Sequence, residues 1–154
     1  MPAILTPWRA VSAMFLLNGS LLGIWASRIP TIRDAKGLDM SQVGLLLLVM
    51  AVGALLSFPV AGRLADRFGA VLLTRILAVL YAASLVCIAI VPVSVLALGV
   101  AMFFFGATHG AMDVTMNSWA TEVEKAAGRP IMSSFHALWS VGPGLGALSG
   151  VFAG

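Results

Sequence analysis

Charged residues are scarce in this 154-residue chain, where Asp, Glu, Lys and Arg together make up 10% of the sequence. Soluble domains carry roughly 25% charged residues. Hydrophobic residues make up 60%, and the mean hydropathy is +1.04. A soluble fold of this length leaves much of its chain at the surface and cannot bury so many apolar side chains. The shortage of charge therefore excludes an ordinary soluble domain and predicts a protein embedded in a lipid bilayer.

Cysteine and clustered acids are missing as well. Cys87 is the single cysteine, so the chain can form no internal disulfide or thiolate metal site. Asp113 is the one acid inside an apolar run, and with His109 four residues earlier it supplies too few ligands for a metal. Membrane enzymes usually need clustered acids, metal ligands or an activated nucleophile. We therefore expect no enzymatic activity, no metal and no cofactor.

Five apolar runs are long enough to cross a bilayer, which takes a helix of about 20 residues. They cover residues 8–27, 42–61, 71–91, 95–119 and 134–154. Helices are expected because an open sheet would leave backbone groups unpaired in lipid. The predicted fold class is all-α, a polytopic transmembrane helical bundle. The last run ends without a polar tail, so we expect a truncated chain, and a complete five-helix protein is the alternative.

The basic residues predict the orientation of the bundle. They fall in short clusters between the apolar runs, which does not indicate a nucleic-acid partner. Six lie at the amino terminus and in the second and fourth connections, and three lie in the first and third connections. Since Lys and Arg are in excess on the cytoplasmic side of a membrane, this distribution predicts a cytoplasmic amino terminus. The six are Arg9, Arg63, Arg67, Arg75, Lys125 and Arg129, and the three are Arg28, Arg33 and Lys36.

A motif with two glycines and three charges joins the second and third runs, with the sequence GRLADRFG over residues 62–69. Gly62 and Gly69 permit tight turns at two helix ends, and Asp66 can cap a helix or pair with Arg67 or Arg75. The motif resembles the signature between the second and third helices of major facilitator transporters. The resemblance implies a gating latch between two transporter halves that uses Gly62, Asp66, Arg67, Gly69 and Arg75. Basic residues usual after the last glycine are replaced here by Ala70 and Val71.

The fourth run gathers its polar groups on one face. At 100° per residue, a single arc of 100° contains Gly106, His109, Gly110, Asp113 and Asn117. An acid at mid-helix costs about 2.5–3.5 kcal/mol on insertion scales, so it indicates a functional site by default. We interpret this face as the border of a watery path, with Asp113 able to take up and release a proton. A structural pairing of Asp113 with Arg28 or another helix is the alternative.

A second resemblance concerns the same run. The stretch from Asp113 to Asn117 resembles the acid-x-x-x-Asn of the fourth helix in a fucose-permease-like bacterial branch. It implies that Asp113 takes part in proton coupling.

Polar and aromatic residues in three runs are candidates for lining a substrate route. In the first run, Asn18 and Trp25 lie roughly opposite a stripe of small residues that includes Gly19 and Gly23. The other candidates are Asn117, His136 and Trp139.

The resemblance as a whole implies five of the six helices of an amino-terminal major facilitator half. It implies a secondary transporter in a bacterial inner membrane that moves a small polar solute, such as a sugar, with a proton. Its partners would be lipid, solute, proton and the missing carboxyl-terminal half. The alternatives are a drug or metabolite efflux antiporter, suggested by the stretch 142–146, and a small membrane assembly module that transports nothing.

Overall fold

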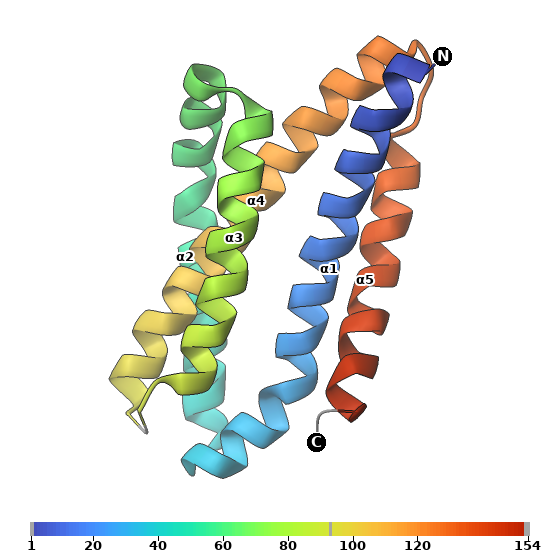
Figure 1. The fold of residues 1–154 in the computed structure, drawn as a ribbon. Coiled ribbons are helices and arrows are strands. Elements are labelled where there is room, and N and C mark those ends of the chain that lie inside the picture. Colours follow the sequence, from blue (N-terminus) through green and yellow to red (C-terminus); the bar gives the residue numbers. More distant parts are fainter. Residues whose placement is uncertain (1, 93, 153–154) are drawn as a thin grey trace.

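The computed structural model describes the backbone of residues 2–92 and 94–152, and the burial of side chains in residues 6–92 and 94–149. This part of the chain forms helices only, which confirms the all-α prediction. The helices are long and are joined by short connections (Figure 1). They are α1 (Pro2–Lys36), α2 (Met40–Phe68), α3 (Ala70–Ile90), α4 (Val95–Ala127) and α5 (Met132–Phe152).

Three helices run further than the sequence predicted. Residues 28–36, 62–68 and 120–127 were expected in connections, yet they continue α1, α2 and α4. Hydropathy identifies only the part of a helix that lies in the lipid. Ala, Glu and Lys also favour helix formation in water, and six of the residues 120–127 are of these types. The connections are correspondingly short, and a single residue, Gly69, separates α2 from α3.

Glycines bring the helices together in two close pairs, α1 with α5 and α2 with α4 (Figure 1). A Cβ atom on Gly23 would collide with the backbone of Pro143 in α5, and one on Gly106 would collide with the backbone of Met50 in α2. The stripe of small residues that includes Gly19 and Gly23 is thus the surface of α1 that packs against α5. The interpretation of Gly106 and Gly110 as the border of a watery path is wrong, because small residues here let two backbones approach and α2 covers both glycines.

Side chains cap the starts of helices at three connections, and at the start of α4 Ser94 Oγ accepts a hydrogen bond from the Ala97 amide at 3.3 Å. At the start of α2, Asp39 Oδ1 accepts a hydrogen bond from the Gln42 amide at 2.8 Å, and Gln42 Oε1 accepts one from the Asp39 amide at 3.0 Å. At the start of α5, Glu124 Oε2 accepts hydrogen bonds from the amides of Ile131 and Met132 at 2.8 and 2.6 Å. Because the first amides of a helix have no partner within it, these carboxylates fix how each helix begins.

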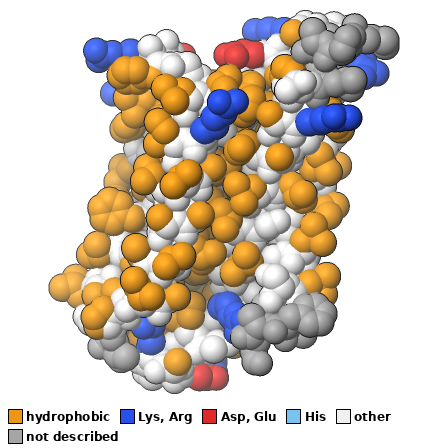
Figure 2. All heavy atoms as spheres, viewed as in Figure 1, with side chains coloured by type: hydrophobic (Ala, Val, Ile, Leu, Met, Phe, Trp, Pro, Cys, Tyr) orange, Lys and Arg blue, Asp and Glu red, His pale blue; other side chains and the backbone are white. Residues whose placement is uncertain are grey.

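The outer surface is apolar around the middle of the bundle. Hydrophobic side chains cover the waist, and most charged side chains lie toward the two ends (Figure 2). Within the described residues, α1 to α4 are long and apolar enough to cross a membrane. The fifth crossing stays a prediction, and α5 packs along the length of α1 (Figure 1).

Candidate functional site

The polar residues of α4 lie side by side on a partly exposed face. The Asn117 Nδ2 atom donates a hydrogen bond to the backbone oxygen of Asp113 at 2.8 Å and lies 3.4 Å from Asp113 Oδ1. On one flank Gly110 meets α2, and on the other Phe105 stacks on Trp25 of α1. The Asp113–Asn117 pair therefore occupies the strip of α4 between α1 and α2.

Asp113 forms no ion pair within the described part of the chain. A structural salt bridge to Arg28, the alternative raised by the sequence, is therefore not present there. Both Asp113 and Asn117 are half-buried rather than sealed.

Asn18 and Trp139 come together across the α1–α5 interface. The indole Nε1–H of Trp139 donates a hydrogen bond to Asn18 Oδ1 at 2.9 Å. Asn18 is 0% exposed, and its Nδ2 has no hydrogen-bond partner among the described residues. Two predicted lining residues thus form one polar contact, with an amide donor still available.

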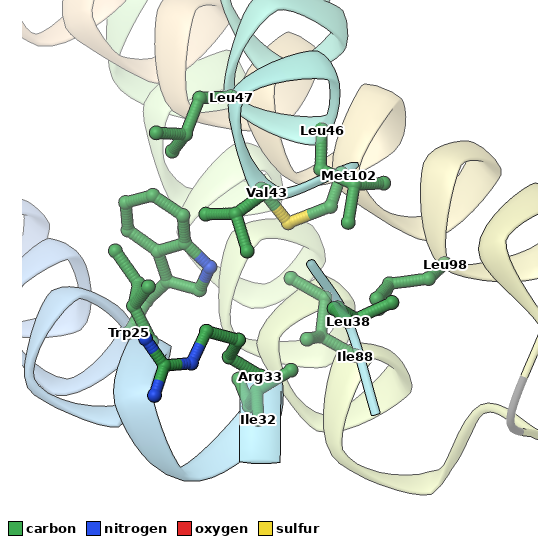
Figure 3. A pocket seen from close by; sticks show the side chains of 11 residues that line it. Trp25, Ile32, Arg33, Leu38, Val43, Leu46, Leu47, Ile88, Leu98 and Met102 are labelled. Atoms are coloured by element: carbon green, nitrogen blue, oxygen red, sulfur yellow. The ribbon is translucent and has the colours of Figure 1, made fainter. Parts of the chain in front are cut away.

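Trp25 begins a stack of rings that crosses three helices. Its ring centroid lies 5.5 Å from that of Phe105, which lies 4.9 Å from Tyr81, and Tyr81 lies 5.2 Å from His109. Trp25 also points into a narrow pocket whose wall is otherwise almost entirely aliphatic, with Arg33 at its side (Figure 3). Trp25 is therefore packed in the bundle, with 7% of its surface exposed.

His136 stands apart from Asp113. It is exposed on α5, its ring meets that of Phe15 of α1 edge-on with centroids 5.3 Å apart, and its Nδ1 lies 3.1 Å from the Met132 backbone oxygen. No contact between His136 and Asp113 occurs within the described residues. The structure thus joins Asp113 to Asn117 and Asn18 to Trp139, and among the described residues Trp25 and His136 belong to neither pair.

The α2–α3 motif differs from its prediction in two respects. Gly62 lies inside α2 with open space around it, so it is not a turn at a helix end. Gly69 is the turn, with φ at +86°. In the part of the chain described, Asp66 makes no cap and no ion pair, and Arg67 and Arg75 lie over the rings of Phe68 and Trp119. The Asp66 carboxylate is exposed and remains available to a partner outside this chain segment.

Two residues with structural roles were missed by the sequence analysis. Tyr81 of α3 is fully buried, and its hydroxyl has no partner among the described residues. Glu124 ties the end of α4 to α5. Tyr81 could have been found as the only tyrosine of the chain, placed in an otherwise apolar run, whereas no local signal marks Glu124.

The fold and the polar strip define a multi-spanning helical membrane protein with an intramembrane acid. Comparison with known sequences agrees, since the profile of the Major Facilitator Superfamily matches residues 2–154. The chain belongs to the Major Facilitator Superfamily. The recognition of this family from the α2–α3 motif is thereby confirmed.

Three bacterial relatives resemble the chain. Over 99% of this chain, it is 52% identical to an uncharacterized transporter of Sinorhizobium fredii. Over 86% of this chain, it is 36% identical to an uncharacterized MFS-type transporter of Yersinia pestis. It is 37% identical to the membrane protein MosC of Rhizobium meliloti over 86%. No solved structure matches. The chain spans 40%, 34% and 32% of the lengths of these relatives.

Proposed function

We propose that the chain is part of a proton-coupled secondary transporter of a bacterial inner membrane, and that Asp113 carries the proton. The single observation behind this proposal is the Asp113–Asn117 pair, a half-buried acid and amide on a membrane-crossing helix without an ion-pair partner in the described residues. Intramembrane acids are costly and tend to mark ion or substrate pathways.

The solute in this proposal is small and polar, with sugars as the first class to test. Amide N–H groups suit hydroxyl acceptors, and Asn117 presents a half-buried amide on the strip of α4. In this proposal, a second half of the protein faces the Asp113–Asn117 strip of α4, and the solute passes between the two halves.

The proposed orientation places the amino terminus in the cytoplasm. The amino end of α1, the α2–α3 turn and the α4–α5 connection lie at one end of the bundle (Figure 1). Six of the nine basic residues lie near that end in sequence, which supports this orientation.

Close helix packing offers a second explanation for the stretch 142–146, which suggested the antiporter alternative. Gly142 and Gly146 pack against the α1 backbone, and Pro143 meets Gly19 and Gly23. Helix packing accounts for this stretch without a role in exchange.

Transport by the full-length protein in proteoliposomes tests the proposal. With an inward proton gradient and radiolabelled L-fucose and D-galactose as probes, the wild-type protein should accumulate at least one sugar. Asp113→Asn should abolish the accumulation and leave protein insertion unchanged, and Glu122→Gln, an exposed acid on the same helix, should behave as wild type. Accumulation by Asp113→Asn at the wild-type level would refute the role of Asp113.

A further inference from the structure

The interface between α3 and α4 holds two buried polar atoms that have no hydrogen-bond partner among the described residues. They are the hydroxyl oxygen of Tyr81 and the Nδ1 atom of His109. The two helices pack against each other (Figure 1), and the centroids of these two rings lie 5.2 Å apart. Buried polar atoms in folded proteins are nearly always hydrogen-bonded, either to protein or to an ordered water. Two such atoms on touching rings indicate a hydrogen bond between them, direct or through one water.

The other hydroxyl groups of this interface already have partners. The Ser84 hydroxyl donates to the Tyr81 backbone oxygen at 2.7 Å and lies 3.2 Å from Thr108 Oγ1. The Thr108 hydroxyl lies 2.8 Å from the Phe104 backbone oxygen, to which it donates. Since a hydroxyl has a single proton to donate, these two groups leave the Tyr81 hydroxyl as the donor for His109 Nδ1.

The imidazole of His109 reaches from this interface toward Asp113. The side chain is half-buried as a whole, whereas its Nδ1 atom is sealed. Asp113 follows four residues later on α4, a spacing that makes two side chains neighbours on a helix, and its charge acts on His109. In the described part of the chain, the titratable groups that face His109 are therefore Tyr81 from α3 and Asp113 from α4.

The position of the imidazole proton follows from the hydrogen bond at Nδ1. A bond to one ring nitrogen of a histidine determines which nitrogen carries the proton. When Tyr81 donates to Nδ1, the proton of the neutral ring is on Nε2, at the other edge of the ring. The Nε2–H group is then a donor for the Asp113 carboxylate, and such a hydrogen bond favours the ionised form of an acid.

We propose that His109 is a positioning residue for the Asp113 proton, held by Tyr81 in the tautomer that donates a hydrogen bond from Nε2 to the ionised carboxylate. His109 thereby lowers the pH at which Asp113 takes up its proton. The inference rests on the proposed role of Asp113 and adds α3 to the groups that control it.

Infrared difference spectroscopy of the full-length protein tests the inference without any solute. The band of the protonated Asp113 carboxyl is identified by its loss in Asp113→Asn, and it is followed against pH. His109→Leu should raise the pH at which half of the band is present by roughly one unit, because the carboxylate loses a hydrogen-bond donor. Tyr81→Phe should shift this midpoint in the same direction, since Nδ1 loses its partner. His109→Gln keeps an N–H donor and should stay close to wild type.

Ser84→Ala is the matched control, because it removes a buried hydroxyl and a contact between α3 and α4 without changing His109. Its midpoint should equal that of wild type. A wild-type midpoint in His109→Leu or in Tyr81→Phe would overturn the inference. An equal shift in Ser84→Ala would overturn it too, since the effect would then come from helix packing. If no band disappears in Asp113→Asn, the proposed role of Asp113 is also refuted, whereas a titrating band that does not respond to His109→Leu refutes this inference alone.

Discussion

The indole of Trp139 in α5 donates a 2.9 Å hydrogen bond to the carboxamide oxygen of Asn18 in α1. The two helices otherwise meet through glycines and Pro143, so this is a polar contact within a close-packed interface. Because Asn18 is fully buried, its carboxamide depends on Trp139 for its one hydrogen bond in the described structure.

Asn18→Ala should lower the stability of the protein. Interhelical hydrogen bonds in membrane proteins contribute about 0.6 kcal/mol on average and up to about 1.7 kcal/mol. Thermal unfolding in mild detergent measures the effect, and a double-mutant cycle with Trp139→Phe isolates the pair. Ser27→Ala is the control, since Ser27 is exposed on the same helix and bonds only to Ile24. A coupling energy of zero between Asn18 and Trp139 would contradict this prediction.

Gly106→Ala and Gly44→Ala should have opposite effects. A Cβ on Gly106 collides with Met50 of α2, and overpacking typically costs about 1–3 kcal/mol. Gly44 has no atom near its missing Cβ, so alanine there should be neutral or stabilise the helix by up to about 1 kcal/mol. Unfolding curves of the two variants measure both effects. A Gly106→Ala protein as stable as wild type would contradict the close backbone contact between α2 and α4.

Substitutions at the two glycines of the α2–α3 motif should distinguish an effect on stability from an effect on gating. Gly69 has a left-handed φ of +86°, so Gly69→Ala should cost about 1–2 kcal/mol of stability. Gly62 is helical and has open space around it, so Gly62→Ala should fold as well as wild type. If Gly62 belongs to a latch that contacts the second half, Gly62→Ala should still slow transport. Normal transport by a normally stable Gly62→Ala protein would remove Gly62 from the latch.

Glu124→Ala should loosen the start of α5. Its carboxylate accepts two backbone hydrogen bonds there, and losing a helix cap costs about 0.5–2 kcal/mol. Hydrogen exchange of the first turn of α5 should speed up in Glu124→Ala but not in Glu122→Ala, where the exposed side chain makes no such contact. Equal exchange in both variants would contradict the capping role.

The positions of the membrane helices along the chain could be predicted, because a helix in lipid needs a long apolar stretch. Apolar length located all five helices along the chain. The helix ends could not be predicted the same way. Residues 28–36 include four charged side chains, Arg28, Arg33, Asp34 and Lys36, yet they stay helical.

The site was harder to predict because residues on the same arc of a helix can meet different neighbours. Gly106 and Asp113 share an arc of α4, but α2 covers the glycine while the acid stays half-exposed. Trp25 was expected to line a substrate route, and besides facing a narrow pocket it packs on Phe105, a contact between α1 and α4 that no local pattern encodes.

Water access to the strip of α4 that carries Asp113 tests the central claim directly. The test uses the full-length protein with Cys87→Ser, and it compares the variants Asn117→Cys and Val79→Cys. Val79 is the control because it is an exposed apolar residue of α3. It lies two residues from Tyr81, whose ring contacts His109 of α4. N-ethylmaleimide reacts with thiolates that water can reach, and a thiol in lipid stays protonated. The account predicts that Cys at position 117 is labelled much faster than Cys at position 79. Equally slow labelling at both positions, in every condition that shifts the transporter between states, would contradict it.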